Sequence, residues 1–468
     1  MKTPLVRTCA GACLLTLLGA AHIETAAAQE SAPQPAQPRE FTVATPSSIT
    51  LANGLEATFI DFGKVPKVTI AISVRVGALN DGDRTWLSDV TAELMKEGTQ
   101  SRTAEEITDA AADMGGEVAI GVGADQTTLS LDVLSEFGPD AVALLAEILT
   151  RPRLPESELP RIRSNFLRNL SVQLATPQAQ ADAAFSALMF PNHPYGRVFP
   201  TPEQLQSYTI DDVRNFYAQN FGAQRTHVYV AGKFDRASIE AAVRRQLGGW
   251  LEGPSALRLL SPPPGAPVTK VIDRSDAPQS TVRIGTRVID PTQSEFMPLS
   301  VANTLLGGVL TSRITMNLRE DKGWAYSPGS SLGTYYRHAV WSEDADVKSE
   351  STGPALGEVF KEIARLQGQP PSAGELTATK NYRNGIFVMS NATRGGLIGQ
   401  FAFMDLHGLP IEWLTTFVER LYAVTPDQVS KAVRDNLDPM RMSVVVVGDM
   451  SKVRPQLQGI DPLPKLAP

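Results

Sequence analysis

Two distant segments of this 468-residue chain match each other, and this repeat constrains the fold most strongly. Residues 209–232 read TIDDVRNFYAQNFGAQRTHVYVAG, and residues 425–448 read TPDQVSKAVRDNLDPMRMSVVVVG. They align without a gap, with identities at Thr209/Thr425, Asp211/Asp427, Val213/Val429, Asn220/Asn436, Arg225/Arg441 and Gly232/Gly448. Each segment is typical of a capped helix that leads into an apolar strand. Any capped helix before a buried strand looks similar, but the gapless match favours an internal duplication.

A proline-rich segment separates the two copies. Residues 251–268 include the run SPPPGAP, which is the clearest linker signal in the chain. We therefore predict an α+β protein with two homologous α/β-sandwich halves, residues 41–250 and 269–455, joined by this linker. Residues 456–468 would form a C-terminal tail.

The N-terminus has the features of an export signal. A short basic region precedes an apolar stretch at residues 8–21, and three alanines at 26–28 provide a small-residue cleavage site. We expect residues 1–28 to be a cleaved signal peptide that directs the chain to a bacterial periplasm. A mitochondrial transit peptide would be richer in arginine. Residues 29–40, rich in proline and glutamine, are expected to be a disordered linker.

Periodicity and turn residues predict the other elements. Asn53-Gly54 between two strand-like runs predicts a hairpin. Further strands are expected at 68–76, 117–122, 127–133, 269–273 and 280–289, and helices at 87–96, 103–113, 139–148 and 156–174. The net charge of −7 and the lack of a basic run give no support to nucleic-acid binding. We also expect no membrane span in the mature chain.

The stretch from Gly307 to Tyr326, GGVLTSRITMNLREDKGWAY, carries the candidate functional residues. A helical run follows the double glycine, and Gly323 can end it by taking a positive φ. Residues 324–326 are expected to begin a strand. Arg319 and Tyr326 then lie around one turn, where a guanidinium and a phenol can hold a carbonyl oxygen or oxyanion. The alternative is a solvated helix arginine and a half-buried strand aromatic.

In order and spacing, this stretch resembles the C-terminal half of the pitrilysin/insulinase family of zinc peptidases. That family carries Gly-Gly, Ser-Arg, Leu-Arg-Glu and Gly-x-x-Tyr in the same order. The resemblance implies that Arg319 and Tyr326 contact the substrate backbone from across a closed chamber, facing a zinc site. It extends over about residues 41–455 and implies two halves that face each other like a clamshell.

The metal half of the family pattern is replaced. The family's zinc motif is His-x-x-Glu-His, in a run that closes with Gly-Thr. Aligned on Gly98-Thr99, its histidines fall on Asp89 and Glu93, and its catalytic glutamate falls on Ala92. The matching region for a third ligand, at about 161–174, contains no acidic residue. We therefore expect this chain to bind no metal of its own.

Two other features of the first half, an expected edge strand and a pair of acidic residues, do not indicate a catalytic site. The family usually carries Asn-Ala where Ala119-Ile120 stand here, in a strand that pairs with the substrate backbone. Asp89 and Glu93, four residues apart, could bind Ca²⁺ or Mg²⁺, although such a pair on an exposed helix face is usually just solvated. No nucleophile motif or phosphate-binding loop is present.

These residues lead to a main hypothesis and two alternatives. The resemblance implies a non-catalytic subunit of a heterodimeric periplasmic zinc metallopeptidase, in which Arg319 and Tyr326 bind peptide substrates. A homologous partner chain would then carry the zinc and its His-x-x-Glu-His motif. The first alternative is a proteolytically inactive peptide-binding or scaffold subunit. The second is an autonomous enzyme that uses Asp89 and Glu93 with an unusual metal.

Overall fold

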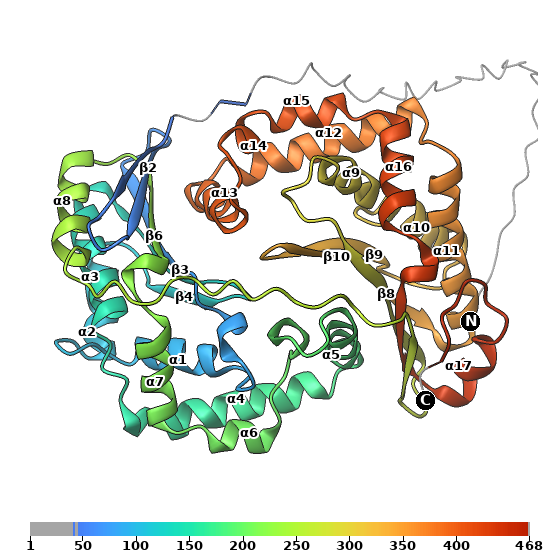
Figure 1. Ribbon diagram of the computed structural model, residues 1–468, viewed down its shortest axis with the longest axis horizontal. Coiled ribbons are helices and arrows are strands. Elements are labelled where there is room, and N and C mark those ends of the chain that lie inside the picture. Colours follow the sequence, from blue (N-terminus) through green and yellow to red (C-terminus); the bar gives the residue numbers. More distant parts are fainter. Residues whose placement is uncertain (1–40, 43–44, 467–468) are drawn as a thin grey trace, which may run out of the picture. The chain divides into compact units, whose positions relative to one another are not determined.

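The computed structural model describes residues 41–42 and 45–466 (Figure 1). The expected signal peptide, 1–28, and the expected linker, 29–40, lie outside the described residues. Residues 251–268 form neither a helix nor a strand. Within the described part of the chain, no helix is both long enough and apolar enough to cross a bilayer.

The first half of the chain builds a six-stranded mixed sheet. Its strands are β1 (Ser47–Thr50), β2 (Glu56–Asp61), β3 (Lys67–Val74), β4 (Ala119–Val122), β5 (Thr127–Leu134) and β6 (Thr226–Gly232), in the order β1-β2-β6-β3-β5-β4. Its helices are α1 (Leu87–Lys96), α2 (Ala104–Asp113), α3 (Gly138–Thr150), α4 (Leu159–Leu174), α5 (Pro177–Met189), α6 (Pro202–Ser207), α7 (Ile210–Asn220) and α8 (Arg236–Leu247). The predicted hairpin at Asn53-Gly54 is confirmed as β1 paired antiparallel with β2.

The second half builds a five-stranded mixed sheet. Its strands are β7 (Thr269–Asp273), β8 (Gln279–Val288), β9 (Gly329–Tyr335), β10 (His338–Lys348) and β11 (Ser443–Gly448), in the order β7-β11-β8-β10-β9. Its helices are α9 (Phe296–Leu306), α10 (Arg313–Thr315), α11 (Thr352–Gly368), α12 (Ala373–Ser390), α13 (Arg394–His407), α14 (Glu412–Thr415), α15 (Phe417–Ala423), α16 (Pro426–Asn436) and α17 (Met450–Gln456).

The two sheets share one topology once β1 is set aside. In each half, the first strand pairs parallel with the last, as β2 with β6 and β7 with β11. The last strand then pairs antiparallel with the second, as β6 with β3 and β11 with β8. The repeated segments form equivalent helix–strand units, α7–β6 and α16–β11. This equal strand order agrees with the predicted duplication.

Each half also packs one helix against the other half's sheet. Helix α13 of the second half contacts β3 and β6, and the residues Ala71 and Tyr229 on these strands belong to the same buried cluster as α13. Helix α5 of the first half contacts β8 and β11. Ion pairs fix both contacts, Arg394 to Asp132 at 2.8 Å and Arg283 to Asp182 at 2.7 Å. The face of the first sheet under α13 thus becomes a boundary between the halves.

The repeated helices begin with the same capping box. Thr209 Oγ1 accepts a hydrogen bond from the Asp212 amide at 3.2 Å, and Asp212 accepts one from the Thr209 amide at 2.9 Å. In the second copy, Thr425 Oγ1 accepts from the Gln428 amide at 3.2 Å, and Gln428 accepts from the Thr425 amide at 2.8 Å. Both pairs satisfy amides that the first helical turn leaves free.

Removing either cap should destabilise the fold by a similar amount. Thr209→Ala and Thr425→Ala should each lower the free energy of unfolding by about 1 kcal/mol, because an N-cap threonine satisfies a backbone amide at the helix start. Urea unfolding of each variant measures the change. Thr377→Ala, at an exposed position inside α12, serves as the control. A cap variant as stable as wild type would show that the box contributes nothing.

Candidate functional site

Arg319 and Tyr326 meet at the protein surface. Arg319 lies in a π-helical segment, Met316–Asp321, that continues α10. Gly323 has a φ of 62°, the positive value predicted for the residue that ends this helical run. The guanidinium carbon of Arg319 lies 4.9 Å from the centroid of the Tyr326 ring, and that tyrosine is 76% exposed. The local sequence therefore brings a cation and a phenol to one accessible position.

The prediction that a strand begins at residues 324–326 is wrong. Strand β9 begins at Gly329, and Ala325 forms only an isolated bridge with Val347. The amides of Trp324 and Ala325 instead donate to the Leu318 carbonyl, at 2.9 and 3.3 Å. These two amides satisfy a carbonyl at the end of the π-helical segment, so they do not donate to a neighbouring strand. Tyr326 is consequently held in a loop beside Arg319.

Close packing explains the double glycine that opens the stretch. A Cβ at Gly307 would lie 2.5 Å from Glu343 Oε2 and 2.6 Å from the Ser330 amide nitrogen. A Cβ at Gly308 would lie 2.8 Å from the Thr304 Cα. Atoms cannot approach this closely without a backbone shift, so neither position accepts a side chain as the chain stands.

A bidentate ion pair anchors the helical run that carries Arg319. Arg313 Nε and Nη2 donate to the two carboxylate oxygens of Glu375, at 2.7 and 2.9 Å. Among the described residues, the one ion pair of Arg319 is with its neighbour Glu320, Nε to Oε1 at 3.1 Å. The Ser-Arg of the sequence pattern is therefore structural, because Arg313 ties this run to α12. Arg319, in contrast, keeps some of its guanidinium N–H donors available for a ligand.

The helix α1 places the replaced metal positions together but does not make a zinc site. Asp89 is half-buried rather than on an exposed face, and burial, with a contribution from Glu93, raises its pKa to about 6. Glu93 pairs with Lys96 at 2.6 Å, and Ala92 is 4% exposed. On α4, the residue Arg168 donates to Asn165. Structural and catalytic zinc sites use histidine or cysteine ligands in nearly all cases, and none is present here.

A buried aspartate shapes the start of α1. Asp81 accepts hydrogen bonds from the amides of Trp86 and Ser88, at 2.9 and 2.8 Å, and burial raises its pKa to about 7. Its role is to order the backbone that leads into α1. Across the described residues, no group of three or more His, Cys, Asp or Glu side chains is arranged to hold a metal ion. The residues of this half thus do not fit the zinc that the family pattern implies.

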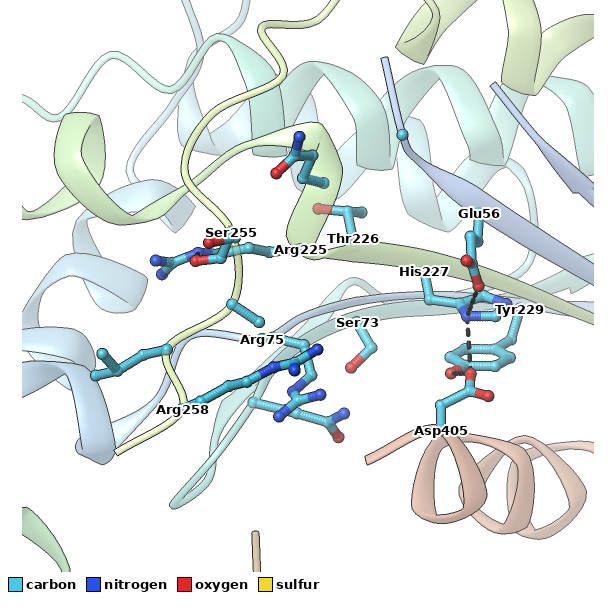
Figure 2. A pocket seen from close by; sticks show the side chains of 15 residues that line it. Glu56, Ser73, Arg75, Arg225, Thr226, His227, Tyr229, Ser255, Arg258 and Asp405 are labelled. Carbon is cyan, nitrogen blue, oxygen red and sulfur yellow. Dashed lines mark hydrogen bonds and ion pairs between the residues drawn. The ribbon is translucent and has the colours of Figure 1, made fainter. Parts of the chain in front are cut away.

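A cavity that the sequence did not predict lies between the first sheet and α13 (Figure 2). Its volume is about 840 Å³, within the range of ligand sites. Its lining includes side chains from β2, β3, β6, the 255–258 segment and α13. Figure 2 shows arginines 75, 225 and 258 toward one end and Glu56, His227 and Asp405 toward the other.

The acidic end of the cavity is organised around His227. Its Nδ1 lies 2.7 Å from Asp405 Oδ2 and 3.5 Å from Glu56 Oε2. Its ring stacks on Tyr229 at a centroid distance of 4.2 Å, and the Tyr229 hydroxyl donates to Asp405. Because Asp405 belongs to α13, these bonds join that helix to β6. The histidine thus has polar partners on its ring nitrogen and packs against an aromatic ring.

His227 also contacts a hydroxyl, but not in a usable catalytic arrangement. Its Nε2 lies 2.8 Å from Thr58 Oγ1, so the order hydroxyl, imidazole, carboxylate matches that of a nucleophilic triad. However, Thr58 is 4% exposed, bonds to Ser48 Oγ at 2.8 Å and does not line the cavity. A substrate cannot reach this oxygen, so the bonds serve packing rather than hydrolysis.

Comparison with known proteins identifies the fold and the family. The structure aligns with the peptidase M16 inactive domain from Pseudomonas fluorescens (TM-score 0.80, 21% identity, 87% of this chain and 98% of that chain). It also aligns with a protease from Helicobacter pylori (TM-score 0.80, 16% identity, 87% of this chain and 100% of that chain). The two mixed sheets and their helices thus form the α+β fold of M16 peptidases.

Sequence comparisons add the family. Residues 62–203 match the insulinase (peptidase family M16) model, and residues 207–382 match the peptidase M16 inactive domain model. An uncharacterized zinc protease of Mycobacterium leprae is 24% identical over 409 residues, covering 85% of this chain and 91% of that protein. One of Bacillus subtilis is 23% identical over 387 residues, covering 82% and 94%. The chain is a homologue of the M16 insulinase/pitrilysin family of zinc proteases.

Proposed function

We propose that this chain is the non-catalytic subunit of a heterodimeric zinc metallopeptidase and supplies Arg319 and Tyr326 for binding peptide substrates. The observation that carries the proposal is the pairing of half-buried Arg319 with exposed Tyr326, with 4.9 Å between the guanidinium carbon and the ring centroid. The same chain has Asp89, Ala92 and Glu93 at the metal positions. A homologous partner chain would contribute zinc and the His-x-x-Glu-His motif. Both residues lie within the segment that matches the inactive-domain model.

In this proposal, the pair donates hydrogen bonds to a carbonyl oxygen of the peptide substrate. The guanidinium of Arg319 offers a planar set of N–H donors to a substrate carbonyl, and the Tyr326 hydroxyl adds another. Stacking on the ring orients the guanidinium before a substrate arrives. A donor that is already in place stabilises the developing oxyanion more than the neutral carbonyl, which lowers the activation barrier.

The proposal includes an architecture and a compartment. Residues 41–250 and 269–455 would act as two halves of a clamshell around a chamber, with residues 251–268 as the connection. Export by the signal at residues 1–28 would place the chain in the periplasm. The alternative of a proteolytically inactive peptide-binding or scaffold subunit keeps the same architecture. The arginine-lined cavity favours peptide binding within that alternative, because it offers charged groups to a ligand.

Assay of the isolated chain tests the first part of the proposal. The purified mature chain should hold far less than one zinc per molecule after incubation with zinc and desalting, and it should not cleave denatured protein or peptides. Metal content is measured by mass spectrometry, with a peptidase that carries the zinc motif treated in parallel. One zinc per chain together with cleavage that a zinc chelator abolishes would refute the non-catalytic assignment.

A further inference from the structure

We propose that the cavity between the first sheet and α13 binds a peptide through its carboxylate, which pairs with Arg75 and Arg258. The proposal rests on the proposed peptide-binding function and names the chemical group that this second position recognises. Arg319 and Tyr326 do not line the cavity, so the two positions are distinct. The carboxylate can be the C-terminus of a peptide or the side chain of an acidic residue.

At the cationic end of the cavity, no arginine forms an ion pair with a carboxylate of the described residues. Within the described residues, the ion pairs that involve side chains lining the whole cavity are those of His227 with Glu56 and Asp405, at its acidic end. In the part of the chain that the structure describes, neither Arg75 nor Arg258 has a carboxylate within ion-pair distance, although Arg75 stacks on Tyr336 at 4.9 Å. Guanidinium groups that converge without a counterion repel one another, and a bound anion relieves that repulsion.

A third arginine sets the position of the other two. Arg225 Nε donates to the carbonyls of Pro254 and Ser255, at 3.0 and 2.9 Å, and so fixes the segment that carries Arg258. Burial and the charge of Arg75 both lower the pKa of Arg225. Figure 2 shows Arg75 and Arg258 extending into the same space. Because Arg225 is only 7% exposed, it acts as a positioning residue rather than a ligand.

A buried hydroxyl supplies the second indication of a ligand. Ser73 lines the cavity, is 3% exposed, and its Oγ has no hydrogen-bond partner among the described residues. Buried hydroxyls normally have a hydrogen-bond partner, because a buried hydroxyl without one costs about 1–3 kcal/mol of stability. A carboxylate oxygen held by Arg75 would accept this hydrogen bond. Ser73 lies on β3 and Arg75 follows the last residue of that strand, Val74, so the two lining residues are two positions apart at the same end of β3.

The opposite end of the cavity indicates what else the ligand carries. Glu56 and Asp405 have side chains that are 58% and 41% exposed, so they present negative charge beside the space. A polyphosphate that filled the cavity would meet these carboxylates and be repelled. A peptide can place its carboxylate at the arginines and its amides or a basic group at the acids. The volume of about 840 Å³ also exceeds what a lone inorganic anion needs.

Calorimetric titration of the full mature chain without a partner tests the proposal. The probes are N-acetyl-tetraalanine as the free acid, its C-terminal amide, and the same amide with one alanine replaced by glutamate. At least one carboxylate peptide should bind about tenfold or more tightly than the neutral amide, and this preference should weaken as salt rises. A preference for the free acid identifies a C-terminus as the source, and one for the glutamyl peptide identifies an acidic side chain.

Two variants make the test specific. Arg258→Ala, at an exposed position outside helices and strands, should reduce the preference about tenfold or more, and Arg75→Gln should do the same with the backbone fold retained. Arg441→Ala, the counterpart of Arg225 in the repeat and exposed outside the cavity, is the matched control. Equal binding of the acid and amide peptides, no binding of any probe, or an unchanged preference in Arg258→Ala would overturn the proposal.

The titration separates this inference from the composite peptidase site. It reads binding rather than cleavage, and it needs neither zinc nor a partner chain. If Arg319 had no effect on cleavage, the cavity could still prefer carboxylate peptides. If the cavity showed no such preference, the effect of Arg319 on cleavage would be unchanged.

Discussion

Replacing Arg319 by alanine should lower kcat for peptide cleavage by the reconstituted two-chain complex about 10²–10³-fold, the usual effect of removing one oxyanion donor. The reason is that the guanidinium would act most strongly on the charge that develops in the transition state. Tyr326→Phe keeps the ring on which Arg319 stacks but removes the hydroxyl, so its effect should be smaller. Steady-state kinetics of each complex provides the measurement.

Assembly must be intact for that result to be informative. Arg319 is half-buried, and in the part of the chain that the structure describes its guanidinium contacts only Glu320 and the Tyr326 ring, so its loss should not unfold the chain. Size-exclusion chromatography of the variant with its partner confirms this. Arg454→Ala, at an exposed position on α17, controls for the loss of a positive charge. A variant complex that cleaves peptides at the wild-type rate would show that Arg319 has no catalytic contribution.

Glu343→Gln should stabilise the chain at neutral pH by an amount that grows with pH. Glu343 lies on β10, is 1% exposed, and neither of its carboxylate oxygens has a hydrogen-bond partner among the described residues. Burial, and to a lesser degree the charge of Asp344, raises the pKa of Glu343 well above its usual value. The folded chain therefore keeps this group protonated when the unfolded chain has already lost the proton.

The sign of the effect follows from proton linkage. As pH rises above the pKa of the unfolded glutamate, the unfolded state binds fewer protons than the folded state, so the free energy of unfolding falls. The fall is about 1.4 kcal/mol for each pH unit until the folded-state pKa is reached. Glutamine is neutral in both states and lacks this slope. The difference in stability between Glu343→Gln and wild type should thus increase from pH 5 to pH 7.

Urea unfolding at several pH values measures this difference. Glu350→Gln, at an exposed position beyond the end of β10, is the matched control and should follow wild type at every pH. If the Glu343→Gln variant showed the same pH dependence as wild type, the carboxyl would not be protonated in the folded chain. The measurement needs no partner and no substrate, so it tests the burial of Glu343, which lies close to Gly307, by itself.

Local signals predicted much of the fold because their causes are local. The helix caps at Thr209 and Thr425 depend on residues within one helical turn, and the sequence predicted a capped helix in each repeated segment. The positive φ of Gly323 was likewise predicted from its place at the end of a helical run. The strand start at residues 324–326 was not, because it depends on which carbonyl those amides reach. Leu318 takes them, and β9 begins later.

The candidate site divides in the same way. Arg319 and Tyr326 are close in sequence, so one turn brings them together and their proximity could be predicted. The cavity combines Glu56, Arg75, His227, Arg258 and Asp405, which only the sheet order and the docking of α13 assemble. Nothing in a single sequence indicates that these residues share one space. The half-burial of Asp89 was also missed, because it arises from packing around α1 rather than from residue type.

The most direct test of the central claim is capture of the tagged chain from its native cells, followed by mass spectrometry of the eluate and assays for zinc and peptide cleavage. The proposed function predicts a stoichiometric homologous partner that carries His-x-x-Glu-His, and zinc-dependent cleavage that this chain lacks on its own. A chain that elutes alone, or only with partners that have no peptidase motif, would contradict the composite site.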